Sequence, residues 1–205
     1  MKKLSLILIA FAVVTVLGAT SASATAFNVC PNVGFDTAGC QLLITVTAVN
    51  GSGAATAWTV TTNPSNLGPF DGVEDTLIGI TNSASGTLTS ISLTGGVGSG
   101  VFAFDGDGAC IGTYSPGPTA AQCPVGGFTG ADPFDYASAG ASFGAYTADS
   151  GIVNVSLANG ASTWFDLEGV INAQQLSSTP EPGSLVLFGS GLLGLAAMLR
   201  RKLGI

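Results

Sequence analysis

The sequence has no histidine and no basic side chain between Leu4 and Leu199. Its five Lys and Arg residues are confined to positions 2–3 and 200–202, and charged residues of either sign make up only 8% of the chain. Soluble domains usually contain about 25% charged residues. The long central segment therefore carries carboxylates without any cationic side chain that could neutralise them.

These absences exclude most common biochemical functions for the central segment. Nucleic acids are bound through Lys and Arg contacts to phosphate, so no nucleic-acid partner is expected. Phosphoryl chemistry needs the same side chains, and Ser–His or Cys–His nucleophiles need a histidine. The spacing of the four cysteines does not suit zinc. A pair of carboxylates, as in glycoside hydrolysis, is the one common catalytic plan that stays open.

Residues 1–26 have the organisation of a secretory signal peptide. Two lysines precede an almost unbroken apolar run over 4–17, and small-x-small patterns follow at 22–24 and 24–26. Signal peptidase is the expected processing enzyme, and an uncleaved membrane anchor is the alternative. The apolar run is short for a membrane-spanning helix, which favours cleavage and export.

The C-terminal segment begins with a linker over 172–183 that contains a Pro-Glu-Pro turn signal. An uncharged stretch over 184–199 follows, which as a helix spans roughly 24 Å, and local thinning closes the gap to a hydrocarbon core of ~30 Å. A basic tail over 200–205 stays in the cytoplasm by the positive-inside rule, so the preceding domain faces outward. The motif residues are Pro180, Glu181 and Pro182, and the membrane stop signal is Arg200, Arg201 and Lys202.

This tail resembles the PEP-CTERM sorting signal of Gram-negative bacteria, which combines a Pro-Glu-Pro motif, one apolar helix and a terminal basic cluster. The resemblance covers about residues 179–202. It implies processing by an exosortase, a membrane transpeptidase-like enzyme, in organisms that make extracellular polysaccharide. The tail would then be a transient inner-membrane anchor, and its residues would act as substrate rather than as catalysts. A simple tail anchor with a fortuitous Pro-Glu-Pro is the alternative.

The ectodomain expected at 27–171 contains short runs of alternating apolar and polar residues, separated by turn signals. Seven or more short strands at this spacing predict an all-β fold, an antiparallel β-sandwich of jelly-roll or Ig-like type. The stretch over 106–150 is weakly patterned and is expected to be a long excursion with one or two poor strands. The expected strands are 41–49, 55–61, 75–81, 87–94, 101–104, 152–158 and 162–170.

Four cysteines lie in the segment that is expected to face an oxidising compartment, so disulfides are expected. Three pairings are open. The nearest-neighbour pairing, Cys30–Cys40 and Cys110–Cys123, is favoured because each bond closes a short loop around Gly or Pro residues. Each bond would contribute on the order of 2–3 kcal/mol, and the second would staple the long excursion. Free thiols are the alternative.

Two acidic clusters are candidate metal sites, one just before an expected strand and one at a strand end. Alternating Asp and Gly lets carboxylates and backbone carbonyls converge on a hard cation, and Ca²⁺ takes about 6–8 oxygen ligands. No complete EF-hand loop is present. A structural Ca²⁺ site and ordinary turns with solvated carboxylates both stay open, and no other cofactor is required. The candidate ligands are Asp71, Glu74, Asp75, Asp105 and Asp107.

A third group of acidic residues, a pair, lies late in the chain. Strand alternation places Asp166 and Glu168 on the face of Trp164, opposite Phe165 and Leu167. An exposed aromatic ring beside acids can hold a sugar, whereas a packed core position is the simpler role for this tryptophan. A glycosidase pair would be drawn from these two acids and the five cluster carboxylates.

Three hypotheses about function follow. The first is a non-enzymatic protein that crosses the inner membrane, is anchored with its domain outside, and reaches the cell surface or extracellular matrix beside exopolysaccharide. The second is an adhesin-like module that binds a carbohydrate or another surface polymer, assisted by Ca²⁺. The third is a carboxylate hydrolase. Ice binding ranks below these, because the Thr-x-Thr pairs at 45–47, 59–61 and 87–89 follow no regular repeat.

Overall fold

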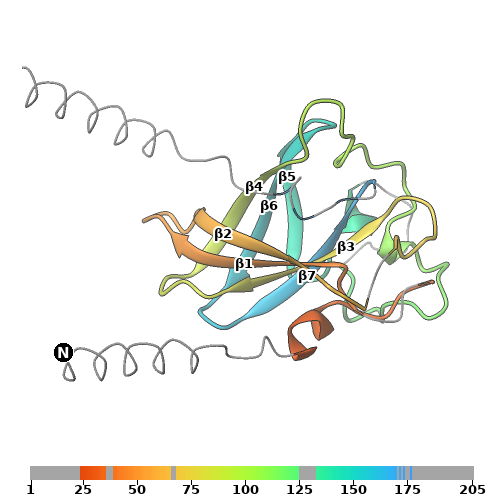
Figure 1. The fold of residues 1–205 in the computed structure, drawn as a ribbon, viewed down its shortest axis with the longest axis horizontal. Coiled ribbons are helices and arrows are strands. Elements are labelled where there is room, and N and C mark those ends of the chain that lie inside the picture. The colour runs from red at the N-terminus through yellow and green to blue at the C-terminus, as the bar shows by residue number, and fades with distance from the viewer. Residues whose placement is uncertain are drawn as a thin grey trace, which may run out of the picture.

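The computed structural model describes residues 24–35, 39–65, 68–124, 133–169, 171, 173 and 176. These residues form two β-sheets, and the helices among them are short 3₁₀ turns (Figure 1). The strands are β1 (Leu42–Val49), β2 (Ala55–Thr62), β3 (Thr76–Asn82), β4 (Leu88–Thr94), β5 (Ala141–Tyr146), β6 (Ser150–Leu157) and β7 (Ser162–Leu167). The 3₁₀ helices are η1 (Ala24–Val29), η2 (Ala109–Ile111) and η3 (Phe134–Tyr136). The prediction of an all-β fold in two sheets is confirmed.

One sheet has the strand order β2-β1-β3-β7 and the other has the order β4-β6-β5. Neighbouring strands are antiparallel except β1 and β3, which run parallel. The expectation of a wholly antiparallel sandwich, as in Ig-like or jelly-roll domains, is therefore wrong for this pair. Parallel strands need a long crossover, and the connection between the end of β2 and the start of β3 supplies it, since β3 lies on the opposite side of β1 from β2.

The main hydrophobic core lies between the two sheets. Ile44, Ile78 and Phe165 from the larger sheet are fully buried in one cluster with Ile91 and Val153 from the smaller sheet. Burying an aliphatic or aromatic side chain of this size contributes about 1.5–3 kcal/mol. The period-two patterns of the sequence are the inward faces of these strands.

The outer face of β3 and β7 is covered by a second layer, built from the disulfide-bonded loops. The disulfides join Cys30 to Cys40 and Cys110 to Cys123, which is the nearest-neighbour pairing. Their sulfurs share a second apolar cluster with Leu77 of β3 and Trp164 of β7. Trp164 is only 4% exposed, so it is a core residue and offers no open ring to a sugar.

One segment differs from the strands expected. Residues 101–104 form a turn, although Val101 and Phe102 are buried as core residues. The N–H of Ala103 donates to the carbonyl of Gly100 and closes this turn, and the Asp149 carboxylate accepts the N–H groups of Gly98 and Gly100 just before it. The apolar alternation therefore reflects side chains inserted into the core and not the hydrogen-bonded pairing of a strand. In the described part of the excursion, β5 forms an edge strand beside β6.

The export segments lie almost wholly outside the described residues. These are the signal peptide expected at 1–26, the linker over 172–183, the apolar helix over 184–199 and the basic tail over 200–205. Within the described ranges, no helix is long and apolar enough to cross a membrane.

Candidate metal centre

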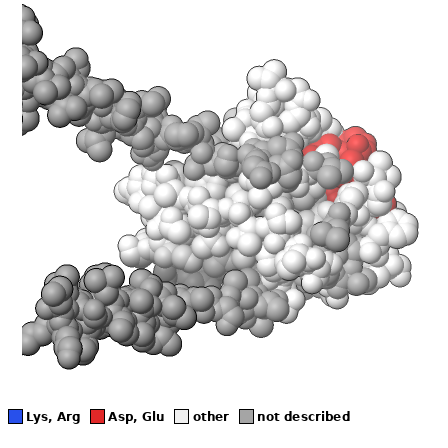
Figure 2. Space-filling model, viewed as in Figure 1, with Lys and Arg blue, Asp and Glu red and all other residues white. Residues whose placement is uncertain are grey.

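Acidic side chains gather at one end of the molecule, which is the red patch in Figure 2. They come from three segments that are far apart in the sequence. Antiparallel pairing places Thr76 of β3 opposite Leu167 of β7, so the residues next to this pair, Asp75 and Glu168, lie at the same edge of the sheet. The loop over 105–108, which follows the turn at 101–104, supplies the third segment.

Five carboxylates form two overlapping groups at this edge. The oxygens of Asp75, Asp107 and Glu168 lie within 4.8 Å of one another, and so do those of Glu74, Asp105 and Glu168. Glu168 belongs to both groups. We call these five residues the acidic cluster.

Asp75 is the most deeply buried member of the acidic cluster. Its side chain is 0% exposed, and neither carboxylate oxygen accepts a hydrogen bond from a backbone, hydroxyl or amide donor; its hydrogen-bond contact is with the carboxyl group of Asp107. Glu168 is 7% exposed and its Oε2 atom lacks a partner. An ionised carboxylate that is buried without a partner costs several kcal/mol, so the group must be neutralised by a proton or by a cation.

The hydroxyl of Tyr136 fixes the loop that carries Asp105 and Asp107. It lies 2.9 Å from Oδ1 of Asp107 and 3.2 Å from Oδ1 of Asp105, and it accepts the backbone N–H groups of both residues. A hydroxyl has one proton, so it donates fully to one carboxylate at a time. Burial, together with the nearby carboxylates, raises the pKa of Tyr136 far above its ordinary value, and the hydroxyl stays a donor.

Glycine is required at two positions of the Asp-Gly-Asp-Gly loop. Gly106 has a φ of 96°, in the region that favours glycine. A Cβ atom on Gly108 would lie 2.7 Å from the backbone carbonyl of Asp135 and 2.8 Å from Cγ of Tyr136. The loop can pass this close to η3, and so to the other carboxylates, only because residue 108 has no side chain.

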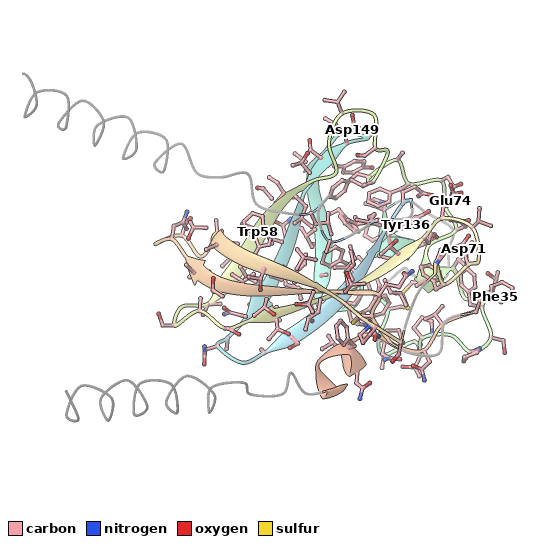
Figure 3. The ribbon with its side chains drawn as sticks, in the orientation of Figure 1. Phe35, Trp58, Asp71, Glu74, Tyr136 and Asp149 are labelled. Carbon is pink, nitrogen blue, oxygen red and sulfur yellow. A yellow bond between two sulfur atoms is a disulfide. The ribbon has the colours of Figure 1, made fainter. Side chains whose placement is uncertain are left out.

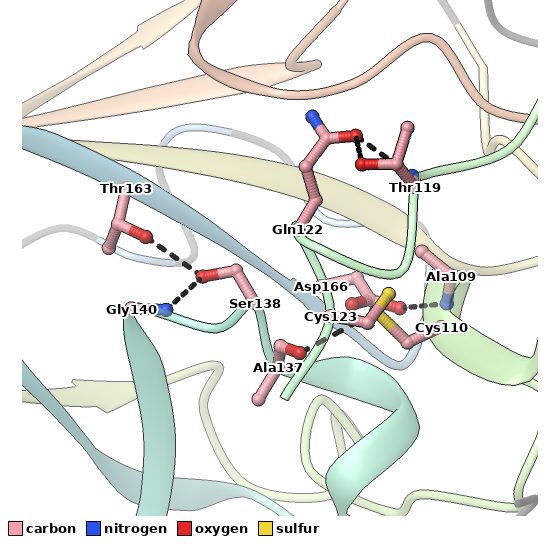
Figure 4. Close-up of a disulfide and its surroundings, with 10 residues drawn as sticks. All are labelled: Ala109, Cys110, Thr119, Gln122, Cys123, Ala137, Ser138, Gly140, Thr163 and Asp166. Carbon is pink, nitrogen blue, oxygen red and sulfur yellow. Dashed lines mark hydrogen bonds between the residues drawn. A yellow bond between two sulfur atoms is a disulfide. The ribbon is translucent and has the colours of Figure 1, made fainter. Parts of the chain in front are cut away.

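Asp166 lies beneath the acidic cluster and is sealed from solvent. Its Oδ2 atom accepts the N–H of Ala109 at 2.8 Å, beside the Cys110–Cys123 disulfide (Figure 4), whereas Oδ1 has no partner. The side chain is fully buried. It supports the loop at η2 from below, and a substrate could not reach it without displacing that loop.

Asp71, one of the five residues predicted as metal ligands, has a different role. Its Oδ1 atom accepts the backbone N–H groups of Val73, Glu74 and Asp75 at 3.0–3.1 Å. This is the turn-forming use of Asp that the sequence left open. The carboxylate orients the turn that presents Glu74 (Figure 3) and lies in neither of the two groups of the acidic cluster.

The acidic cluster resists ionisation in the absence of a cation. Burial, reinforced by Asp166 and Asp107, raises the pKa of Asp75 to about 10. Burial also raises the pKa of Glu168 to about 7 and shifts the pKa of Asp107 and Asp166 upward. At neutral pH the cation-free cluster therefore retains protons that the same residues would release in water.

The tertiary structure brings together four of the five predicted ligands and adds Glu168. Sequence reasoning did not include Glu168 among the metal ligands; it placed this residue beside Trp164 and among the seven acids from which a glycosidase pair could be drawn. One feature of the sequence could have pointed to Glu168. This residue directly follows β7, and Asp75 directly precedes β3, the strand that pairs with β7. Neither segment by itself shows that the two strands pair. All donors are oxygens, and this is the chemistry of a hard cation such as Ca²⁺.

The comparisons with known proteins concern the tail rather than this site. The model of the PEP-CTERM protein-sorting motif matches residues 178–202, which include Pro180, Glu181 and Pro182 and end at Lys202. The chain therefore carries this motif, which supports an exported substrate of exosortase, as the tail predicted. No curated protein and no solved structure matches the chain.

Proposed function

We propose that this chain is a non-enzymatic protein of the cell surface or extracellular matrix of a Gram-negative bacterium, delivered by exosortase and associated with exopolysaccharide. The observation that carries the proposal is the PEP-CTERM motif over 178–202. Two further features support it. The ectodomain has two disulfides, which suit an oxidising compartment, and residues 4–199 contain no basic side chain.

The proposed route has two membrane steps. Signal peptidase removes residues 1–26, and the segment over 184–199 then holds the protein in the inner membrane with the ectodomain outside. Arg200, Arg201 and Lys202 act as the stop signal on the cytoplasmic side. Exosortase recognises the Pro-Glu-Pro motif and separates the ectodomain from this anchor.

Substitution of the motif tests the route. In a host that contains an exosortase, the variant Pro180→Ala with Glu181→Ala should remain in the inner-membrane fraction with its tail intact. The wild type should lose the tail and appear at the surface or in the medium, as measured by fractionation and the intact mass of the protein. Ser177→Ala is the matched control in the same spacer and should behave like the wild type. Equal processing of wild type and double variant would contradict the proposal.

Binding of a carbohydrate or another surface polymer is the second candidate function, and one aromatic ring favours it. Phe35 is 84% exposed, and a Cβ atom on Gly72 would lie 2.9 Å from its ring, so the ring sits beside the turn that leads to Glu74 (Figure 3). An exposed ring next to acidic groups can stack on a sugar while a bound cation engages its hydroxyls.

A glycan array read in the presence of Ca²⁺ tests this second candidate. Wild type should bind a defined set of acidic or neutral glycans, and Phe35→Ala should weaken that binding by about fivefold or more, since stacking is worth on the order of 1 kcal/mol. Val97→Ala truncates a fully exposed apolar side chain at a different turn and should bind like the wild type. Binding that survives Phe35→Ala would count against the ring as a sugar platform.

A further inference from the structure

We infer that Asp75, Asp107 and Glu168 bind one Ca²⁺ ion, with Glu74 and Asp105 at its rim, and that this ion joins three chain segments at one end of the sandwich. The inference concerns the folded ectodomain alone and does not depend on the sorting route.

The spacing of the oxygens fits a single ion. Each of the three carboxylates offers an oxygen within 4.8 Å of the other two. Calcium binds oxygen at about 2.3–2.6 Å, so two ligands on opposite sides of one ion are roughly 5 Å apart. The three oxygens can therefore contact one ion with small side-chain movements.

The burial of two of these carboxylates is a second observation that points to a bound cation, independent of the spacing of the oxygens. Asp75 is completely buried, lies among the other carboxylates, and receives no hydrogen bond from a backbone, hydroxyl or amide donor, so that only the carboxyl group of Asp107 contacts it as a hydrogen-bond partner. Glu168 Oε2 is buried and unpartnered. Ordinary solvated turn carboxylates have neither property, because water completes their hydrogen bonds.

The chain itself has no means of neutralising this charge. There is no Lys, Arg or His between Leu4 and Leu199, so no salt bridge can form with these carboxylates from within the ectodomain. A shared proton on Asp75 is the competing explanation, and it predicts indifference to calcium. Calcium is favoured over magnesium because Mg²⁺ keeps most of its water and takes one or two carboxylates, whereas three segments here supply up to five.

A bound ion would stabilise the fold in the same way as a crosslink. Asp75 ends the crossover that leads into β3, Asp107 lies in the loop before η2, and Glu168 follows β7. These positions are separated by 32 and 61 residues along the chain (107 − 75 and 168 − 107). Joining them orders the loop over 105–108, which no strand pairing holds in place.

Thermal unfolding of the exported chain, with its tail retained and in detergent, tests the inference. Excess Ca²⁺ should raise the melting temperature by roughly 5–10 °C over chelator, the shift expected at about 100 times the dissociation constant for a domain of this size. Terbium, which replaces calcium in oxygen sites, should show luminescence sensitised by the nearby ring of Tyr136, and added Ca²⁺ should displace it.

Two variants and one control decide the outcome. Asp75→Asn and Glu168→Gln should each lose most of the calcium-dependent shift and the terbium signal. If one of the two variants does not fold, the calcium response of the other variant still tests the site. Asp149→Asn removes one carboxylate at the turn beside Gly98 and should keep the full shift.

Three results would overturn the inference. The first is an equal melting temperature in calcium and in chelator, which is the outcome expected for a shared proton. The second is a calcium response that persists in both Asp75→Asn and Glu168→Gln. The third is an equal rise with Mg²⁺ at the same concentration, which would remove the assignment to calcium.

Discussion

At the scale of single residues, the buried carboxylate of Asp75 contributes strongly to how the stability of the metal-free protein depends on pH. Asp75 is buried beside Asp107 and Glu168, and burial raises its pKa from 3.8 to about 10. Between these two values the folded state keeps a proton that the unfolded state has released. By linkage, the stability that this proton supports is complete at low pH and is lost as the pH rises.

We therefore expect the melting temperature measured in chelator to fall as the pH rises from about 5 to about 9. Glu168 adds to the lower part of this window, because its pKa is raised from 4.5 to about 7. Asp75→Asn should flatten the profile, since the amide has no proton to lose. Differential scanning calorimetry across this range measures both profiles. A wild-type protein that gains stability across the window, or an unchanged slope in the variant, would contradict the expectation.

At the scale of elements, the segment after β7 belongs to the folded domain. Leu176 is 1% exposed and packs in the main core with Ile171, and its carbonyl accepts the indole N–H of Trp58 at 3.0 Å. Trp58 lies on β2, the edge strand at the opposite side of the larger sheet from β7 (Figure 3). The chain thus crosses the end of the core before it reaches the sorting motif, which begins two residues later at 178.

Truncation of Leu176 should therefore destabilise the domain although it lies beside the tail. Leu176→Ala should lower the free energy of unfolding by about 2–5 kcal/mol, the range for removing a buried leucine side chain. Urea denaturation followed by tryptophan fluorescence measures the change. Val97→Ala, at a fully exposed position, is the matched apolar truncation and should change stability by less than about 0.5 kcal/mol. A loss of less than 1 kcal/mol in Leu176→Ala, on the order of the control, would show that the segment does not belong to the core.

At the scale of the whole molecule, the ectodomain carries charge of one sign. Five of its carboxylates gather at one end, where Figure 2 shows the red patch, and residues 4–199 contain no basic side chain that could pair with them. Repulsion between like charges opposes the compact state, and salt screens that repulsion over a Debye length of about 8–10 Å near physiological ionic strength.

The melting temperature in chelator should accordingly rise when sodium chloride is increased from about 0.01 M to about 0.5 M, because no ion pair within the ectodomain can be weakened by the same screening. Lithium and potassium chloride at matched ionic strength should give the same rise, which separates general screening from specific binding of one ion. A melting temperature that falls with salt would be inconsistent with a domain of this charge distribution.

Local patterns in the sequence were sufficient to predict most of the strands. The period-two runs predicted β1, β2, β3, β4, β6 and β7 to within a few residues, because side chains on one face of a strand meet a single core. The run over 101–104 was misleading because buried turn residues can produce the same alternation. β5 was expected only as a weak strand, since its sequence Ala-Ser-Phe-Gly-Ala-Tyr shows no regular alternation of apolar and polar residues.

The sequence by itself determined that the chain carries a sorting motif and that residues 4–199 contain no basic side chain. The sorting motif is a contiguous run that a processing enzyme reads in order, and the absence of cations is a property of composition. The acidic cluster was decided by the tertiary structure alone. Asp75 and Glu168 meet because β3 and β7 pair in one register, and Asp107 joins them because Gly108 lets its loop pass against η3. Contacts of this kind depend on strand pairing across the whole domain, and no local pattern encodes them.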